Sequence, residues 1–317
     1  MLDFSIIIPV YNAAPLLNRC LDSIFHQKTN YSYEVICIDD GSSDNSIEII
    51  KKRKEKNIIL YQQTNSGPAA ARNKGIELAQ GKYCAFIDAD DYWIAGFIEK
   101  TIQYLEIHKN VIAVNVAQRH ITISGDAIVP LNITLNEKPF IIEDFFSFWG
   151  KNMHICTGSA VMHTQAVKET GGQRIELRIT EDLEFWAYLS FWGKWAFIPE
   201  VLFVSDGGDV TNKEGWLNKM ERRWNNAPSI LEWEKRIIPK MPKVTESYKK
   251  ARGRISRNLT YCQLLSKRLS LSRHEALKYG KYFTKDSIGI LMNLAKYTPL
   301  TWWILSKLLR YREYHRK

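Results

Sequence analysis

The sequence has no evident cysteine pairing, no signal-peptide pattern in its opening residues and no long apolar run. Its five cysteines are odd in number and scattered, without the Cys-x-x-Cys spacing of zinc or redox sites. Asp3 and Pro9 bracket only a short apolar stretch, so we expect no signal peptide. No run approaches the roughly 18 uninterrupted apolar residues that a spanning helix needs. These absences argue against a disulfide scaffold and a spanning protein, and they predict a cytoplasmic protein with reduced thiols.

The sequence also lacks the two glycine-rich loops that commonly cradle phosphates. Gly-x-Gly-x-x-Gly is missing after the first predicted strand, and Gly-x-x-x-x-Gly-Lys-Ser/Thr is missing throughout. This argues against NAD and ATP cradles. A bound diphosphate would instead need a metal ion and a cation such as Arg72 or Lys74. The alternative for Arg72 is an ordinary exposed helix residue.

Positive charge is scarce in the first two thirds of the chain and abundant in the last third. Residues 1–210 hold 19 Lys and Arg against 26 Asp and Glu, a net charge of −7. Residues 211–317 hold 25 against 8, a net charge of +17. A basic segment on a mildly acidic body usually meets something anionic, so lipid headgroups and nucleic acid are the candidates. We place nucleic acid well below lipid, because no recognised nucleic-acid module or stacking motif is present.

What is there is a regular alternation of short β-rich runs and helical patterns, which is typical of βαβ units around a parallel sheet. The chain, with 317 residues and 45% apolar composition, is long enough for one large α/β domain and an appendage. Strands are predicted at 4–10, 34–39, 58–62, 83–88 and 111–117. Helices are predicted at 15–26, 44–55, 68–79 and 95–108, and a helical region from about Met220.

Three carboxylates end the fourth predicted strand within four positions: Asp88, Asp90 and Asp91. Like charges crowded at a strand end repel, so the arrangement needs a compensating cation. An Asp-x-Asp pair suits an ion that prefers oxygen ligands, Mg²⁺ or Mn²⁺, which in turn can hold a diphosphate. We interpret Asp88 and Asp90 as a metal and diphosphate site. The alternative is a solvated turn that caps the next helix.

The other strand ends are polar or small as well, and ligands of open parallel sheets bind at these ends. The first strand ends in Pro9-Val-Tyr-Asn12, the second in Asp39-Asp-Gly-Ser42 and the third in Gln63-Thr-Asn-Ser-Gly67. A second acidic cluster, Glu181 and Asp182, opens an aromatic helical run. The pair can simply favour the helix N-terminus, or one carboxylate can take the proton of an acceptor hydroxyl.

Five ordered motifs carry a resemblance to a known family. They are Ser5-Ile-Ile-Ile-Pro-Val-Tyr-Asn12, Ile38-Asp-Asp-Gly-Ser-Ser-Asp44, Asn65-Ser-Gly-Pro-Ala-Ala-Ala-Arg-Asn73, Phe86-Ile-Asp-Ala-Asp-Asp91 and Glu181-Asp182. In this order and spacing the sequence resembles the inverting glycosyltransferases of family 2, of the type that builds bacterial surface polysaccharides. The match covers about residues 4–210. It implies the GT-A fold, a mostly parallel α/β sheet flanked by helices that binds a nucleotide-sugar.

The resemblance also implies roles for individual residues. Asp182 is the expected catalytic base, with Glu181 the next candidate, and Asp90 with Asp88 is expected to hold Mn²⁺ or Mg²⁺. The segment that follows the base in many members carries a histidine where this chain has Asp206, so we count Asp206 as a third candidate metal ligand. The expected nucleotide-sugar site comprises Pro9, Val10, Tyr11, Asn12, Asp39, Asp40, Gly67, Arg72, Asp88 and Ala89.

The sequence leaves two interpretations of the last helix open. The segment from Thr298 combines a cap residue, a first-turn proline, the pair Trp302-Trp303 and clustered lysine and arginine. Such a helix can lie in a membrane interface, or it can dock on the protein's own body with a solvated basic face. We therefore expect a GT-A catalytic domain at 1–215, with a nucleotide-binding half at 1–110 and an acceptor half at 111–215. A basic helical region at 216–317 would follow, placed at the inner face of the cytoplasmic membrane in the first interpretation.

The predicted function is metal-dependent inverting transfer of a sugar from a nucleotide-sugar, UDP-linked, to a hydroxyl of a glycan or lipid-linked acceptor. One alternative is a sugar-nucleotide or polyanion binding module that has lost catalysis. The other is a sugar nucleotidyltransferase, although the glycine-rich, lysine-bearing loop expected near its N-terminus is missing. The sequence does not indicate an oligomeric state.

Overall fold

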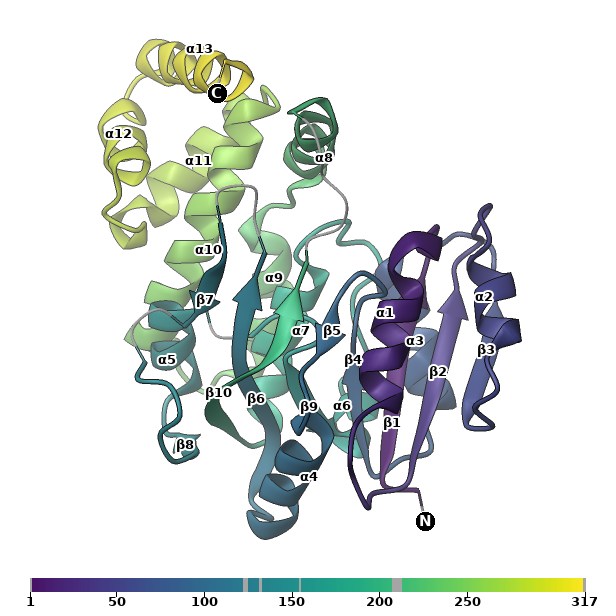
Figure 1. The fold of residues 1–317 in the computed structure, drawn as a ribbon. Coiled ribbons are helices and arrows are strands. Elements are labelled where there is room, and N and C mark those ends of the chain that lie inside the picture. The colour runs from purple at the N-terminus through teal and green to yellow at the C-terminus, as the bar shows by residue number, and fades with distance from the viewer. Residues whose placement is uncertain (1, 122–124, 131–132, 154, 207–212, 316–317) are drawn as a thin grey trace. The chain divides into compact units, whose positions relative to one another are not determined.

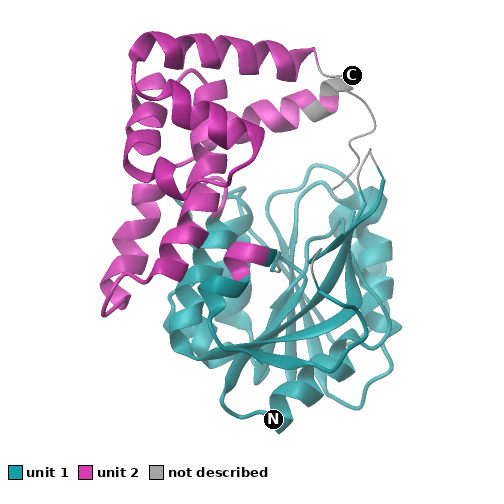
Figure 2. Cartoon of the chain, turned by 90° about the vertical axis from the view of Figure 1, so that its left-hand side faces the viewer, with its two compact units in different colours: residues 1–148, 152–176, 181–209 teal, residues 149–151, 177–180, 210–317 magenta. Residues whose placement is uncertain are grey.

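A computed structural model describes residues 2–121, 125–130, 133–153, 155–206 and 213–315 (Figure 1). These residues form two compact units, which Figure 2 colours separately. The first unit comprises residues 1–148, 152–176 and 181–209, and the second comprises 149–151, 177–180 and 210–317. The predicted boundary at 215/216 falls inside helix α8 (Lys213–Asn226). The functional labels given to the halves of the first 215 residues stay predictions.

The first unit begins with four parallel strands in the order β3-β2-β1-β4. The strands are β1 (Phe4–Val10), β2 (Tyr33–Asp39), β3 (Ile58–Gln62) and β4 (Tyr83–Phe86). The connecting helices are α1 (Ala14–Phe25), α2 (Ser46–Lys52) and α3 (Pro68–Leu78). The predicted β-rich runs are confirmed as strands, although β4 ends two residues early, before the acidic cluster. The predicted α/β fold class is therefore confirmed for this part of the chain.

The sheet continues through strands of mixed direction, in the full order β3-β2-β1-β4-β9-β6-β10-β5. Strand β9 (Ala160–His163) is antiparallel to β4 and to β6 (Val111–His120), and β10 (Lys194–Ser205) is parallel to β6. Short strands complete it: β5 (Tyr92–Trp93) and β8 (Phe140–Ile142) pair with β10, and β7 (Ala127–Val129) pairs with β6. The remaining helices of this part are α4 (Phe97–Ile107), α5 (Phe145–Asn152), α6 (Thr164–Glu169) and α7 (Glu181–Leu189).

Helices cover both faces of the sheet, which explains why β1 and β2 are nearly continuous apolar runs (Figure 1). Ile6 and Ile8 of β1 lie in one core with α1, whereas Ile7 lies in the opposite core with α3. Helix α3 approaches β1 closely at Gly75, where an added Cβ would lie 2.2 Å from the side chain of Ile7. Close packing of this kind holds α3 against β1.

The second unit is helical, as predicted for the C-terminal region. Its helices are α8, α9 (Ile230–Ile237), α10 (Glu246–Leu265), α11 (Leu269–Tyr279), α12 (Ser287–Ala295) and α13 (Pro299–Tyr314). The predicted cap of the last helix is confirmed, because the Thr298 hydroxyl accepts the Thr301 N–H at 3.1 Å. Among the helices that the structure describes, none is both long enough and apolar enough to span a bilayer.

Candidate active site

The carboxyl ends of β1, β2, β3 and β4 bring the predicted strand-end motifs to one edge of the sheet. Val10 pairs with Asp39, and Asp39 in turn pairs with Gln62, so the first three strands end level. The last residue of β4, Phe86, pairs with Ile7. The motif after β4 therefore begins beside the end of β1. The polar runs that follow these strands lie far apart in the sequence, and the fold thus brings them to one edge of the sheet.

Asp40 builds the loop between β3 and α3. Its carboxylate is buried and accepts three hydrogen bonds of 2.8 Å, from Gln63 Nε2, Ser66 N and Gly67 N. Gly67 takes the left-handed conformation with φ of +92°, which favours glycine there. Asp39 is also buried, and its carboxylate accepts the Ser42 N–H at 3.3 Å. Both aspartates therefore shape the strand-end loops.

The loops after β1 and β2 are joined to one another. Asn12 Oδ1 accepts the Ser43 N–H at 2.8 Å, and the Asn12 N–H donates to Ser42 Oγ at 3.0 Å. Asn12 adopts φ of +49°, a conformation that asparagine tolerates better than most residues. The neighbouring Tyr11 leaves 54% of its surface exposed, whereas Val10 is buried. Of the β1 motif, the Tyr11 ring is thus the group most available for stacking on a planar ligand.

Asp88, Asp90 and Asp91 form a carboxylate cluster immediately beyond β4. One ligand oxygen from each lies within 4.8 Å of the others. Asp91 is buried, and burial together with Asp88 and Asp90 raises the pKa of its carboxyl to about 8. Ala89, between them, is buried and fixes the turn. Burial is the largest cause of the raised pKa, and the two neighbouring carboxylates add to it.

The cluster fits a divalent cation on the chemistry of its donors. Three convergent carboxylates offer only oxygen ligands, which Mg²⁺ and Mn²⁺ prefer. A cation would also offset the repulsion from Asp88 and Asp90, which adds to the effect of burial on the Asp91 pKa. Asp91 is one of the three crowded carboxylates but not one of the predicted metal ligands, so its place among the converging ligand oxygens is a finding of the structure.

Arg72 is a buried bridge and not an exposed helix residue, so that alternative is wrong. Only 4% of Arg72 is exposed, on α3. Its Nη2 donates to Asp88 Oδ1 at 2.7 Å, and its Nη1 lies 3.4 Å from Glu181 Oε1. Burial lowers the pKa of Arg72, but Asp88 and Glu181 outweigh it and raise the pKa above its ordinary value. One guanidinium therefore links the acidic cluster after β4 to the acidic start of α7.

Glu181 and Asp182 lie in the first turn of α7 beside this bridge. Glu181 is buried, and burial and the Asp182 charge raise its pKa to about 7, with Arg72 opposing them. Asp182 is half-buried. Cys156 is partly buried, and the pKa of its thiol is raised first by burial and then by Asp91, Asp182 and Asp88. The two acidic clusters, 90 residues apart in the sequence, therefore surround one place in the fold.

The structure places Asp206 next to the carboxylate cluster but outside the group of converging ligand atoms. The Asp206 carboxylate forms an ion pair with Arg19 Nη1, and the Asp206 N–H donates to Asp91 Oδ1 at 2.9 Å. Arg19 also donates to the backbone oxygen of Asp90 at 2.6 Å. A metal-ligand role for Asp206 would require its carboxylate to leave Arg19. Residues 207–212, which continue this segment, lie outside the described residues.

Sequence reasoning missed Arg19 and Gln173. Arg19 lies on α1 in no recognised motif, and its guanidinium stacks 4.8 Å over the Tyr92 ring. Gln173 Oε1 accepts from Arg72 Nη1 at 3.1 Å. The Gln173 backbone N–H donates to Asn73 Oδ1, and the Gln173 backbone oxygen accepts from Asn73 Nδ2, each at 2.7 Å. The one available signal was Asn73, which directly follows Arg72 in a recognised motif.

With this geometry in view, comparison with known proteins identifies the family. The family model described as glycosyl transferase family 2 matches residues 5–171, just over half of the chain. The chain therefore belongs to glycosyl transferase family 2. The match ends before α7, so it covers the motifs at the ends of β1 to β4 and not the Glu181-Asp182 pair.

Two curated relatives resemble about a third of the chain or less. The poly(ribitol-phosphate) beta-glucosyltransferase of Bacillus spizizenii is 43% identical over 96 residues, which is 29% of this chain and 15% of that protein. The uncharacterized glycosyltransferase YibD of Escherichia coli is 49% identical over 89 residues, 27% of this chain and 26% of that protein. The chain thus spans well under half of the length of these two relatives.

Solved structures resemble nearly the whole chain at low identity. S. aureus TarS 1–349 in complex with UDP is 16% identical, with a TM-score of 0.60, over 100% of this chain and 92% of that one. The mannosyltransferase PcManGT from Pyrobaculum calidifontis, in complex with GDP-Man and Mn²⁺, is 19% identical, with a TM-score of 0.58, over 99% and 87%. At these identities the likeness confirms the predicted glycosyltransferase fold and nothing finer.

Proposed function

We propose that this family 2 member is a metal-dependent inverting glycosyltransferase. It moves a sugar from a nucleotide-sugar, UDP-linked, to a hydroxyl of a glycan or lipid-linked acceptor in surface polysaccharide synthesis. The observation that carries the proposal is the buried Arg72, which joins Asp88 of the diphosphate side to Glu181 of the acceptor side. A scaffold has no need of two clusters of like charge around one guanidinium, whereas a group-transfer site does.

On the donor side, Tyr11 and the Asp39 loop would receive the nucleoside, and the loop that Asp40 holds would lie along its ribose and phosphates. Asp88, Asp90 and Asp91 would hold Mg²⁺ or Mn²⁺. A bound divalent cation neutralises the leaving diphosphate. Arg72, fixed by Asp88 at 2.7 Å, adds a permanent positive charge beside the same phosphates.

On the acceptor side, Asp182 would accept the proton of the attacking hydroxyl. Its neighbour Glu181 is buried against Arg72 and has a pKa near 7, so it is already engaged as a partner of the guanidinium. Asp182 is half-buried at the start of α7, a position from which a carboxylate can face an acceptor. Attack from the side opposite the nucleotide would invert the anomeric centre.

The names of relatives support the donor and acceptor classes. One relative is a poly(ribitol-phosphate) beta-glucosyltransferase, and another, the minor teichoic acid biosynthesis protein GgaB of Bacillus subtilis, is 35% identical over 114 residues. TarS, which the fold resembles, has been solved with UDP and with UDP-GlcNAc. We therefore propose a UDP-sugar donor and a polyol-phosphate or glycan acceptor.

A donor panel tests the proposal. The thermal midpoint is measured with UDP-, GDP-, CDP- and dTDP-sugars, each with Mn²⁺ and with chelator, because a ligand that binds the native state raises stability as ln(1 + [L]/Kd). We expect a UDP-sugar to give the largest shift, and we expect chelator to remove most of it. Release of nucleotide in the presence of acceptor then separates a transferase from an inactive binding module.

Asp90→Asn should abolish most of the Mn²⁺-dependent part of nucleotide binding, by about tenfold or more in Kd, because it removes one charged oxygen ligand. Titration calorimetry with UDP, with and without Mn²⁺, measures the effect. The matched control is Glu77→Gln, which neutralises an exposed carboxylate on α3. Equal affinity for UDP with and without metal in the unmutated protein would remove the metal from the proposal.

A further inference from the structure

We propose that α12 and α13 form a docking face for an anionic membrane surface. The proposal concerns the second unit alone and does not depend on the transferase activity. Between Ile290 and Tyr311 these two helices and the turn that joins them expose an unusual number of large apolar side chains. We call this set the outer apolar face. It consists of Ile290, Leu291, Leu294, Tyr297, Leu300, Trp303, Ile304, Leu308 and Tyr311, each between 43% and 70% exposed.

Helix α13 has a second apolar face, which packs inside the unit. Trp302, Leu305 and Leu309 are 1%, 6% and 4% exposed. The Trp302 indole N–H donates to Ser272 Oγ at 3.0 Å. The two interpretations that the sequence left open therefore each describe one face of this helix. One face docks on the protein's own body, and the other is apolar where the docked interpretation expected a solvated basic surface.

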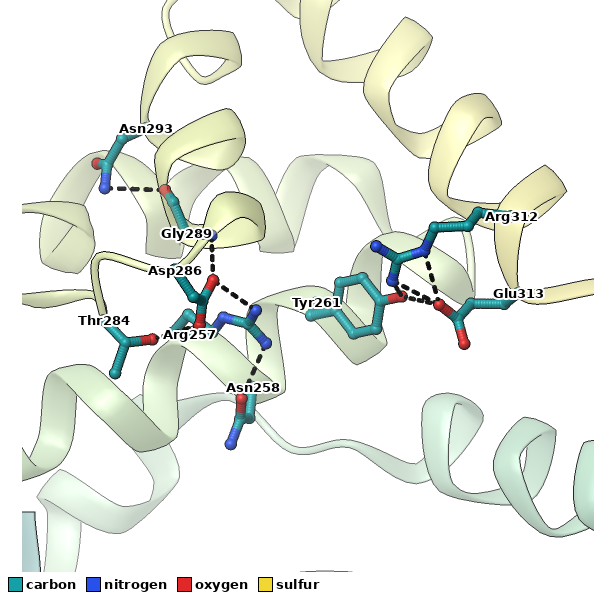
Figure 3. Close-up of polar contacts among 9 residues, drawn as sticks. All are labelled: Arg257, Asn258, Tyr261, Thr284, Asp286, Gly289, Asn293, Arg312 and Glu313. Carbon is teal, nitrogen blue, oxygen red and sulfur yellow. Dashed lines mark hydrogen bonds and ion pairs between the residues drawn. The ribbon is translucent and has the colours of Figure 1, made fainter. Parts of the chain in front are cut away.

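Polar contacts on the inner side hold both helices in place (Figure 3). Asp286 caps α12 by accepting the Gly289 N–H at 2.7 Å, and it pairs with Arg257 of α10 at 2.7 Å. Near the end of α13, Glu313 accepts from Tyr261 of α10 at 2.7 Å, and Arg312 donates to the same tyrosine oxygen. The helices that carry the outer apolar face are therefore held by polar contacts with α10. The exposure of this face is built into the fold.

The charge around the face favours an anionic surface. From Ser287 to His315 the only carboxylate is Glu313, and it is buried. Lys307 lies on the outer face, with its ammonium 5.4 Å over the Trp303 ring, so its stem follows the apolar surface while its charge stays in water. Tryptophan, tyrosine and lysine around a leucine stripe are the composition of helices that lie in a membrane interface.

A membrane fits this face better than a second copy of the chain. Residues 211–317 carry 25 basic against 8 acidic residues, so apposing two copies of this unit would bring like charges together. Anionic headgroups would instead meet the basic residues while the apolar side chains enter the acyl boundary. A symmetric dimer and a protein partner are the competing occupants, and the experiment below separates them.

Vesicle flotation of the full chain tests the proposal. We expect the protein to float with vesicles that contain phosphatidylglycerol, and not with purely zwitterionic vesicles at the same lipid concentration. Leu308→Ser should reduce partitioning by about tenfold, because it removes a buried apolar side chain from the bound state. Lys307→Gln should reduce it by about fivefold at low salt and less at high salt, since surface electrostatics is screened.

The matched control is Ile107→Ser on α4, which removes an apolar side chain that is 68% exposed, close to the 62% of Leu308. Light scattering of each variant gives its oligomeric state, and thermal unfolding shows whether it folds. Partitioning unchanged in Leu308→Ser, or reduced equally in Ile107→Ser, would overturn the proposal. So would a dimer that Leu308→Ser dissociates in a protein that ignores anionic vesicles, because the face would then be a contact between copies.

Discussion

Arg72 is the residue on which the geometry of the site depends most. Burying a guanidinium is costly unless carboxylates pair with it, and here two carboxylates from different elements do so. The planar fork of arginine reaches both, with Gln173 as a third partner at 3.1 Å. A lysine would keep the charge and lose the bridge. The Arg72 side chain thus links Asp88 to Glu181 and also places a fixed positive charge between them.

Asp182→Asn should retain UDP and Mn²⁺ binding but lower sugar transfer by about 10² or more, because a carboxamide keeps the shape of the side chain and cannot accept a proton. Calorimetry measures the binding, and single-turnover transfer to acceptor measures the chemistry. Glu181→Gln serves as the comparison, since Glu181 already faces Arg72. Transfer that persists in Asp182→Asn and disappears in Glu181→Gln would assign the base to the neighbouring residue.

At the residue scale, the sequence predicted which positions lie together in the fold, but not the hydrogen-bond and ion-pair partners of each side chain. Motif order identified Asp39, Asp40 and Asp88, because strand ends of a parallel sheet must meet at one edge. The three donors to Asp40 come from the loop 63–67, and a partner of this kind depends on loop conformation. The pairing of Asp206 with Arg19 joins positions 187 residues apart, and no local pattern encodes it.

At the scale of elements, strands were predicted more closely than helix surfaces. Strands β1 and β3 begin and end where the sequence predicted, because runs of isoleucine and valine bounded by polar residues leave little choice. Strand β4 stops at Phe86 because the next residues turn toward the carboxylate cluster. The faces of α13 could not be predicted, since apolar residues lie all round it and tertiary packing selects which of them is covered.

The loop 171–173 offers a test of how α3 and the region before α7 are held together. Gly172 has φ of +80°, and a Cβ there would lie 2.3 Å from Asn73 Oδ1. We expect Gly172→Ala to cost about 2–4 kcal/mol of unfolding free energy, from the left-handed backbone and the clash together, and to weaken transfer by displacing Gln173. Chemical denaturation measures the stability.

Gly171→Ala is the control for this substitution. Gly171 has φ of +75°, and a Cβ there meets nothing within 4 Å. Gly171→Ala should therefore lower the unfolding free energy only by the backbone cost of roughly 1–2 kcal/mol. The difference between the two variants isolates the contact with Asn73. Equal losses in both would mean that this contact does not hold the loop.

Truncation of the two adjacent tryptophans of α13 should change stability by very different amounts. Trp302→Ala should cost about 3–5 kcal/mol of unfolding free energy, because the side chain is 1% exposed and its indole N–H bonds Ser272. Trp303→Ala should change stability by no more than about 0.5 kcal/mol, since 48% of that side chain is exposed. Thermal and denaturant unfolding measure both. A large loss in Trp303→Ala would place the outer face inside an interface.

For the whole molecule, the buried carboxyls predict how stability depends on pH. The native pKa values of Asp91, about 8, and Glu181, about 7, lie above those of the unfolded chain. The native state therefore holds more protons than the unfolded state, and the unfolding free energy falls as pH rises through these values. We expect the unfolding free energy to fall by an amount on the order of 1–2 kcal/mol between about pH 6.5 and pH 8. The contribution of Asp91 disappears last, because its pKa is the higher of the two.

Thermal unfolding across this range, with and without Mn²⁺, measures the effect. Below about pH 6.5 the half-buried histidines His120 and His163, whose pKa values are lowered by burial, contribute the opposite slope, so the range starts above them. Mn²⁺ should flatten the decline because it favours the ionised carboxylates. Glu181→Gln should remove its share of the slope. Stability that rises with pH in the absence of metal would contradict the assigned burial of these groups.

The bridge at Arg72 links ligand binding at Asp88 to ligand binding at Glu181. A cation that draws on Asp88 reduces what that carboxylate offers to Arg72, and the guanidinium then interacts more strongly with Glu181. A ligand that alters Glu181 must change the affinity at Asp88 by the same factor, since linkage between two binding events has no direction. The electrostatic environment of Glu181 would thus differ according to whether a cation occupies Asp88, and by the same factor whichever of the two ligands binds first.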